Sequence, residues 1–462
     1  MNNATVEIQS LECNLPAEIL FQRISDLPAS IWLDSSSTEG GRYHLISAAP
    51  EKEIRIESAT TEQAQYFFSA SQALLDGFEQ HNTMPGIPFQ GGLISYISYE
   101  LSTASIGVES KERSMMPSGF VGLYLWAIII DTLNQSQQLV VHPQCNPETK
   151  KLVLSRMRNH LNGELPERQE TFALKRPFAA SICEEDYIDD LSQIDDYIRA
   201  GDAYQVNYAQ HFSTRYSGNP LDAYLKLRKF APAPYSGYLQ IDNKALLCHS
   251  PEQFIEVKGQ HARTSPIKGT APRSGDQRLD RRNAEVLQAS EKDRSENLMI
   301  VDLMRNDLGK HCVPGSVQTS KLFELKSYSN VHHLVSEIVG ELRPENTPLE
   351  LLSAALPAGS VTGAPKKRAV EIIRELESRQ RSFYCGNLGY ASFCGNLDFN
   401  IGIRSLVADG QTIHCWGGGG IIADSNPKKE YEETLHKVGG LMSELEAHFL
   451  ALETSEPNQT SA

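Results

Sequence analysis

Two segments carry carboxylates at the spacing of a helix face. Asp293 and Glu296 are three residues apart, and so are Glu430 and Glu433. Residues at this spacing share one face of a helix, so two helices could each present a carboxylate pair. Carboxylates that converge without histidine or cysteine suit Mg²⁺, which prefers oxygen ligands and often shares its shell with an anionic substrate. Two solvated faces of surface helices would show the same spacing.

A lysine stands between a proline and a glycine in the segment Pro266-Ile267-Lys268-Gly269-Thr270. Proline fixes the backbone on one side, and glycine allows close backbone approach on the other. Lys268 would become a nucleophile if desolvation lowered its pKa. Taken alone, the segment also fits a turn with a solvated lysine.

Glycine and arginine supply candidate anion sites. The run Gly417–Gly420 predicts a loop whose bare backbone N–H groups bind a carboxylate or phosphate, although a tight sheet turn fits as well. The segment 360–366 resembles a loop that caps a helix N-terminus, where anions are also favoured. Arg404 lies in the apolar run 401–406, a predicted strand. An arginine there needs a partner, either a captured carboxylate or a structural ion pair.

The elements that must position these residues are mixed. Apolar periodicity and turn residues predict both helices and strands without strict alternation, which favours an α+β fold. The predicted helices are 152–161, 184–200, 281–307, 365–376 and 430–452, the last interrupted at Gly439-Gly440. The predicted strands are 31–33, 92–99, 121–132, 204–215, 238–240, 245–248, 388–393 and 399–407. The polar segment 162–178 is the predicted linker, and the tail 453–462 is expected to fray.

Composition limits the function. The chain has 462 residues, of which 43 are Lys or Arg and 58 are Asp or Glu, so its net charge is −15. We therefore expect no nucleic-acid binding, which needs a basic surface. A small anion should also be repelled unless a metal or local cations reverse the field.

The cellular setting follows from what the sequence lacks. The eight cysteines are scattered without a CxxC pair, so zinc and disulfides are not expected. The longest apolar run, Val121–Ile130, is too short to cross a membrane, and the first residues do not form a secretory signal. We expect a soluble cytoplasmic protein without membrane contact.

Eight ordered motifs together resemble the chorismate-utilising enzymes, most strongly over 186–447. They are 201–207, 250–252, 266–270, 302–309, 332–336, 362–366, 397–404 and 430–437, and segments 32–36 and 88–92 resemble the family's accessory region. The resemblance implies a four-layer α/β/β/α sandwich with mainly antiparallel sheets. It also implies an N-terminal accessory region, 1–165, packed as one unit against a chorismate-binding catalytic region, 175–455.

Two positions indicate which reaction the resemblance implies. Members that aminate chorismate at C4 carry the lysine found here as Lys268, whereas anthranilate-forming members carry alanine. Members that add water to chorismate carry a lysine where this chain has Gln205. The implied reaction is amination of chorismate to 4-amino-4-deoxychorismate, for para-aminobenzoate and folate biosynthesis. The alternatives are anthranilate formation with release of pyruvate, and a chorismate-binding subunit without catalysis.

The resemblance also implies roles for residues. Mg²⁺ is held by Glu296 and Glu433, supported by Asp293 and Glu430. Lys268 attacks C2 while Glu252 protonates the departing C4 hydroxyl, and ammonia then displaces the lysine by attack at C4. Other positions match substrate contacts, with the individual roles of His333 and Ser360 left open. They are Gln205, His333, Ser360, Thr362, Tyr384, Arg404, Gly417, Gly418, Gly419 and Lys437.

Two further partners are implied. The chain has no Gly-x-Cys-x-Gly nucleophile turn, so ammonia should come from a separate glutamine amidotransferase subunit, component II, in a heterodimer. A second set of residues matches the place where anthranilate-forming members hold tryptophan, so L-tryptophan is a candidate ligand and an ordinary core is the alternative. These residues are Ser35, Arg42, Tyr43, His44, Leu45, Pro234, Tyr235 and Ser236.

Overall fold

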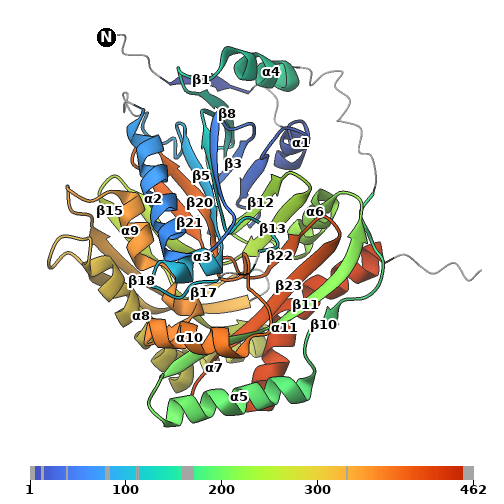
Figure 1. Ribbon diagram of the computed structural model, residues 1–462, viewed down its shortest axis with the longest axis vertical. Coiled ribbons are helices and arrows are strands. Elements are labelled where there is room, and N and C mark those ends of the chain that lie inside the picture. The colour runs from blue at the N-terminus through green and yellow to red at the C-terminus, as the bar shows by residue number, and fades with distance from the viewer. Residues whose placement is uncertain are drawn as a thin grey trace, which may run out of the picture.

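The computed structural model describes residues 6–11, 15–37, 40–78, 84–110, 112, 114–158, 171–328 and 331–450. Within these residues the strands form two large sheets, one of 13 strands and one of 10 (Figure 1). The pairs between named strands in both sheets are antiparallel.

The two sheets draw on distant parts of the chain. The first sheet runs β1 (Glu7–Ser10), β8 (Ser136–Val141), β7 (Trp126–Asp131), β3 (Tyr43–Ser47), β2 (Ile31–Asp34), β12 (Tyr235–Ile241), β13 (Lys244–Ser250), β22 (Ser405–Ala408), β23 (Thr412–Ile421), β11 (Gln205–Ser217) and β10 (Ala179–Ala180), with β19 (Gly363–Ala364) and β9 (Ala173–Leu174) also on β11. The second runs β16 (Ile267–Pro272), β18 (Val331–Glu341), β15 (His261–Thr264), β14 (Gln253–Lys258), β21 (Leu397–Asn400), β20 (Asn387–Ser392), β5 (Gly92–Ile97), β6 (Gly119–Tyr124) and β4 (Lys52–Ile56), with β17 (Gln318–Ser327) on β18. Both predicted regions, 1–165 and 175–455, supply strands to both sheets.

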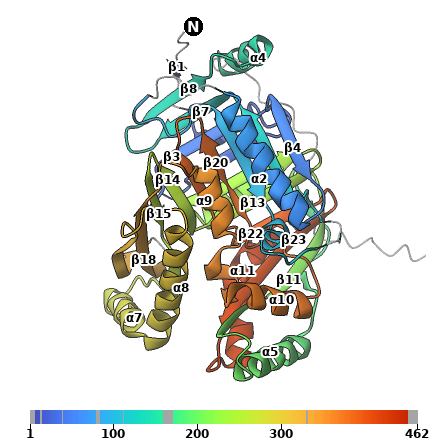
Figure 2. The ribbon, with the colours of Figure 1, turned by 60° about the vertical axis from the view of Figure 1, so that its left-hand side comes forward.

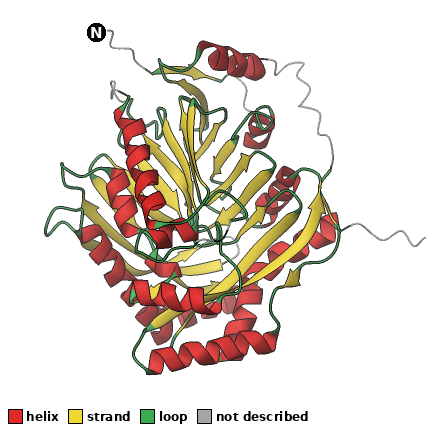
Figure 3. Cartoon of the chain, viewed as in Figure 1, coloured by secondary structure: helices red, strands yellow, loops and turns green. Residues whose placement is uncertain are grey.

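Helices cover the outer faces of the sheets (Figures 2 and 3). The first sheet is contacted by α1 (Ala17–Gln22), α5 (Glu184–Arg199), α6 (Pro220–Phe230), α10 (Lys366–Leu376) and α11 (Pro427–Phe449). The second is covered by α2 (Thr61–Asp76), α7 (Gln277–Ala289), α8 (Glu291–Gly309) and α9 (Pro348–Ala355), and α3 (Tyr99–Ala104) and α4 (Pro147–Arg158) are the remaining helices of the described chain. This arrangement confirms the predicted α+β sandwich with mainly antiparallel sheets.

Two predicted strands prove to be strand pairs that cross between the sheets. The segment 121–132 spans β6 in the second sheet and β7 in the first, and 399–407 spans β21 in the second sheet and β22 in the first. A run of apolar residues shows that a segment is buried, but it does not show where the chain leaves one sheet for the other. Similarly, predicted strand 92–99 ends at Ile97, because Ser98 caps α3 by accepting the Leu101 N–H.

Helix ends also differ from the predictions. The single helix expected over 281–307 is two helices, because Ser290 ends α7 and its side chain caps α8. In contrast, α11 runs without interruption through Gly439-Gly440. Residues 159–170 of the predicted linker and the whole tail 453–462 lie outside the described residues. Among the described helices, none combines the length and apolar character needed to cross a membrane.

The two sheets pack face to face through close contacts at glycine. A Cβ placed on Gly237 of β12 would lie 2.7 Å from Leu388 Cδ2 of β20 in the opposite sheet. We expect Gly237→Ala to lower the free energy of unfolding by about 1–3 kcal/mol, as overpacked cores do. Urea unfolding measures this, with Gly439→Ala on α11 as control because its Cβ would meet no atom within 4 Å. Equal stability of Gly237→Ala and the parent protein would contradict this packing.

Candidate active site

Ser360 joins the predicted nucleophile to the predicted acid. Lys268 of β16 donates from Nζ to the backbone oxygen of Ser360 at 3.0 Å. The Ser360 hydroxyl donates to Glu252 Oε1 at 2.9 Å, and Glu252 is 4% exposed between β13 and β14. Ser360 itself lies in a short 3₁₀ helix, η2 (Gly359–Val361). No sequence pattern indicated that one residue would contact both groups.

Strand β16, which carries Lys268 between Pro266 and Gly269, is irregular at the lysine. The register of β16 against β18 shifts between Ile267 and Thr270, which is a β-bulge that redirects side chains. Gly269 has φ +85°, and a Cβ there would lie 3.0 Å from Asp293 Cγ of α8. Glycine is therefore needed for β16 to approach α8. The alternative of a turn with a solvated lysine is not what the structure shows.

Burial shifts the pKa of Lys268 and that of Glu252 in opposite directions. Burial lowers the pKa of Lys268, against the opposing effect of Glu296 and Glu252. Burial raises the pKa of Glu252, although Lys268 and the Ser360 hydrogen bond act to lower it. Both shifts move toward a neutral amine beside a protonated carboxyl, the forms needed for a nucleophile and a general acid.

The two carboxylate helices meet beside Lys268. Lys292 of α8 places Nζ 3.9 Å from Glu296 Oε1 and 3.3 Å from Glu430 Oε1 of α11, so it bridges the helices. Glu430 is only 4% exposed and also accepts a hydrogen bond from Ser425. Lys437 pairs with Glu433 at 2.6 Å and donates to the Gly418 backbone oxygen at 2.9 Å. Lys292 therefore links the two helices at the buried Glu430, whereas Glu433 on the same face of α11 is exposed.

The donors at this meeting point fit a hard cation, but they do not form a closed cage. Within the described residues, no three His, Cys, Asp or Glu side chains gather closely enough to hold a metal ion. Burial raises the pKa of Glu296, and the nearby carboxylates Asp293 and Glu430 raise it further. The charges of Lys268 and Lys292 act in the opposite direction and lower this pKa. An all-carboxylate set with mutual repulsion matches the oxygen preference of Mg²⁺. The magnesium site stays a prediction.

The predicted glycine loop is wrong, because Gly417–Gly420 lie within strand β23. They pair with Gln210, Ala209, Tyr208 and Asn207 of β11. A Cβ on Gly417 would lie 2.7 Å from the Thr434 backbone oxygen of α11, and one on Gly418 would lie 2.8 Å from Tyr384 Oη. The glycines thus let α11 and its carboxylates pack directly on the sheet. A Cβ on Gly419 would lie 3.4 Å from Glu430 Oε2, so strand β23 forms one wall of the candidate site beside the carboxylates of α11.

The prediction that Arg404 lies inside a strand is wrong. The residue precedes β22 and has φ 49°. Burial lowers its pKa, and its guanidinium pairs with no carboxylate of the described chain. Nearby His333 shares a 2.9 Å hydrogen bond between Nδ1 and Thr270 Oγ1. Burial and the charge of Arg404 lower the pKa of His333 to about 4, so this ring is neutral at pH 7. Arg404 is therefore available for an anionic ligand.

Three other predicted contacts have distinct environments. The buried Tyr384 ring stacks on Trp416 with centroids 6.4 Å apart. Gln205 is 2% exposed, and its Oε1 has no hydrogen-bond partner among the described residues. Thr362 donates to the Ala358 backbone oxygen at 3.0 Å, so its hydroxyl shapes η2.

Most of the residues predicted to bind L-tryptophan line a separate cavity of about 540 Å³. This volume lies within the range of small-molecule sites, about 300–1,000 Å³. Seven of the eight residues line it, while His44 is not in its lining and pairs with buried Asp34 at 2.8 Å. The seven are Ser35, Arg42, Tyr43, Leu45, Pro234, Tyr235 and Ser236. The cavity also contains the sequence-distant Glu256, Arg263 and Asp398, which no short motif could have placed there.

Relatives of known sequence match the chain almost throughout. Aminodeoxychorismate synthase component 1 from Escherichia coli K12 is 38% identical over 446 residues, covering 93% of this chain and 96% of that protein. The Salmonella typhimurium protein of the same name is 41% identical over 444 residues, covering 93% of this chain and 96% of that protein. Anthranilate synthase component 1 from Aquifex aeolicus is 37% identical over 370 residues, covering 78% of this chain and 75% of that protein.

Solved structures and a family profile agree with these relatives. Anthranilate synthase component I from Streptococcus pneumoniae superposes with a TM-score of 0.76 at 27% identity, covering 95% of this chain and all of that one. The menaquinone-specific isochorismate synthase from Escherichia coli has the same fold, with a TM-score of 0.72 at 16% identity and coverage of 96% and 95%. The profile described as chorismate binding enzyme matches residues 28–443. This chain therefore belongs to the chorismate binding enzyme family.

Proposed function

We propose that this chain aminates chorismate with ammonia to give 4-amino-4-deoxychorismate. The observation that carries the proposal is the hydrogen-bonded chain from Lys268 through Ser360 to Glu252. An amine nucleophile beside a buried acid is what a displacement of hydroxyl by amine requires. The names of the Escherichia coli and Salmonella typhimurium relatives support the same reaction.

The chemistry proceeds through this chain's own side chains in two displacements. The neutral amine of Lys268 forms a bond to C2 of chorismate, the two conjugated ring double bonds both shift, and the C4–O bond breaks. Glu252 gives its proton to the departing hydroxyl, which leaves as water. Glu252 regains a proton from the amine now bound at C2. Ammonia then forms a bond at C4, both double bonds shift back, and the bond between C2 and Lys268 breaks, with the extra proton on the new C4 ammonium passing to the departing lysine amine. Ser360 keeps the amine and the acid together at the start of this sequence.

Binding of the dianionic substrate requires positive charge in an acidic protein. Arg404 offers a guanidinium without a carboxylate partner in the described chain, and Lys437 of α11 donates from Nζ to the Gly418 backbone oxygen of β23. Mg²⁺ held by Glu296 and Glu433, with support from Asp293 and Glu430, would neutralise a substrate carboxylate when bound. These groups together reverse the field of the −15 chain at one place.

The ammonia is proposed to come from a glutamine amidotransferase subunit that forms a heterodimer with this chain. The term component 1 in the relatives' names supports a second component. The product would pass to a lyase that releases para-aminobenzoate for folate synthesis. L-Tryptophan is the proposed occupant of the 540 Å³ cavity, where Ser35 and Pro234 match the tryptophan position of the family.

Product identification tests the proposed function. The purified chain is incubated with chorismate, an ammonium salt and Mg²⁺, and products are identified by mass. Aminodeoxychorismate without pyruvate is expected. Anthranilate with pyruvate would instead assign the activity named for the Aquifex aeolicus relative, and no turnover would indicate a binding subunit.

The protonation states of Lys268 and Glu252 predict a distinctive pH profile. The neutral fraction of Lys268 rises with pH, and the protonated fraction of Glu252 falls, so kcat/KM should be bell-shaped. We expect Glu252→Gln to lower kcat by about 10²–10⁴-fold, because it cannot donate the proton. Its residual rate should rise with pH to a plateau, since only the lysine still titrates. A residual profile that still falls at high pH would contradict the acid role of Glu252.

The carboxylate set predicts a specific magnesium dependence. We expect Glu433→Gln to weaken Mg²⁺ binding, and Mg²⁺-dependent chorismate binding, by at least about 10-fold, since a charged oxygen ligand is lost. Isothermal titration of chorismate with and without Mg²⁺ measures this without turnover. The neighbouring exposed Glu432→Gln should behave like the parent protein. Equal Mg²⁺ affinity for the two variants would refute the proposed ligand set.

A further inference from the structure

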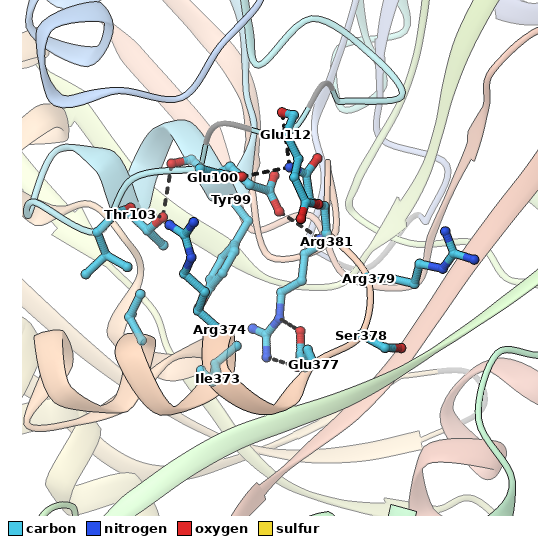
Figure 4. Close-up of a pocket in the computed structure, with 14 residues that line it drawn as sticks. Tyr99, Glu100, Thr103, Glu112, Ile373, Arg374, Glu377, Ser378, Arg379 and Arg381 are labelled. Carbon is cyan, nitrogen blue, oxygen red and sulfur yellow. Dashed lines mark hydrogen bonds and ion pairs between the residues drawn. The ribbon is translucent and has the colours of Figure 1, made fainter. Parts of the chain in front are cut away.

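A buried ion pair lies next to the proposed active site without entering its chemistry. Arg381 Nε donates to Glu377 Oε2 at 2.8 Å, and Nη2 donates to Glu377 Oε1 at 2.6 Å. Arg381 is 1% exposed, and the pair lines a cavity of about 130 Å³ together with Tyr99 and Glu100 (Figure 4). Burying two charges carries a desolvation cost that often cancels their attraction, so stability alone is a weak reason for this pair.

The pair completes a stretch of the β11 edge beside which the described residues place no strand. On this edge β19 pairs with Gln205 and Val206, and β10 pairs further along with Phe212 and Ser213. Between them, Arg381 Nη2 donates to the Asn207 backbone oxygen at 2.5 Å, and the Ala209 N–H donates to Glu377 Oε1 at 2.9 Å. The guanidinium and the carboxylate thus take the places of a neighbouring strand's donor and acceptor.

The same guanidinium holds the segment that contains Ser360. Arg381 Nη1 donates to the backbone oxygen of Val361, the next residue, at 3.2 Å. The Arg381 guanidinium also lies 4.5 Å from the Tyr99 ring centroid and 5.6 Å from that of Tyr384. Its backbone N–H is fixed by Glu100 Oε1 at 2.7 Å. One side chain therefore connects β11, η2 and the turn that carries Tyr384.

We propose that Arg381, oriented by Glu377, is a positioning residue that fixes η2 against β11 and so aligns Lys268 with Glu252 through Ser360. The inference rests on the proposed function for its catalytic readout. The positioning role requires the planar guanidinium of arginine, because this one group donates to the Glu377 carboxylate and to the backbone oxygens of Val361 and Asn207. Lysine would keep the charge opposite Glu377 but could not reach both backbone carbonyls in this geometry.

Chemical rescue tests the proposal. Arg381→Ala should lower kcat about 100-fold, the size of effect expected from a misplacement of about 1 Å. The KM for ammonia should stay within about threefold of the parent value, since Arg381 acts on alignment and not on ammonia binding. The variant leaves a space that opens on the existing cavity. Guanidinium ion added well below its denaturing concentration should therefore raise the kcat of Arg381→Ala at least tenfold. Urea, which has a similar shape but no charge, should not.

Arg374→Ala is the matched control. Arg374 lines the same cavity from α10, and none of the hydrogen bonds that anchor η2 comes from it (Figure 4). Its variant should keep the parent kcat and show no response to guanidinium. If Arg381→Ala does not fold, as judged by circular dichroism and thermal unfolding, Arg381→Lys replaces it. That variant should fold and still lose at least tenfold in kcat.

A second readout does not depend on turnover. The pH dependence of Lys268 labelling by an amine reagent, followed by peptide mass spectrometry, should shift to higher pH in Arg381→Ala and return with guanidinium. Such a shift follows because release of η2 would admit water around an amine whose pKa is lowered by burial. A folded variant with parent kcat and parent Lys268 labelling overturns the inference. A parent protein that makes no aminated product would overturn the proposed function instead, while the labelling result still decides the positioning role.

Discussion

The hydrogen-bonded chain from Lys268 Nζ through Ser360 to Glu252 is the interaction on which the proposed chemistry depends. It places an amine and an acid in one buried region, where burial lowers the pKa of the first and raises that of the second. Each group's charge opposes the other's shift, so burial and not their mutual attraction produces both shifts. The bulge at Lys268, the η2 turn and the Glu377–Arg381 pair all act on the geometry of this chain.

The glycines of β23 and the charged residues of α8 and α11 also determine the surroundings of the Lys268–Ser360–Glu252 chain. Bare backbone at Gly417 lets α11 lie directly on β23, which brings Glu430 toward α8 and its Glu296. Lys292 and Lys437 offset only part of the charge of the four carboxylates Asp293, Glu296, Glu430 and Glu433. A dianion can approach such a region only where added positive charge, such as the proposed Mg²⁺ and Arg404, outweighs the remaining carboxylates.

Sequence patterns located the chemical groups better than the backbone that carries them. The carboxylate spacings predicted two helix faces, because side chains three residues apart must share a face. By contrast, the glycine run was predicted as a loop and is a strand, and Arg404 was expected in a strand but lies at a crossover between sheets. Those features depend on which distant strand pairs with the segment. The links of Ser360 to Glu252 and of Arg381 to Asn207 join residues 108 and 174 positions apart, so no local pattern signals them.

The covalent role of Lys268 is tested most directly by intact and peptide mass spectrometry of the protein mixed with chorismate and Mg²⁺ without ammonia. The account predicts a mass increase equal to chorismate less one water, located on Lys268, that ammonium discharges as aminodeoxychorismate. Lys268→Ala should show no increase, whereas Lys321→Ala, an exposed lysine on β17, should behave like the parent. Formation of aminodeoxychorismate at the parent rate by Lys268→Ala, with no adduct on the parent protein, would contradict the account.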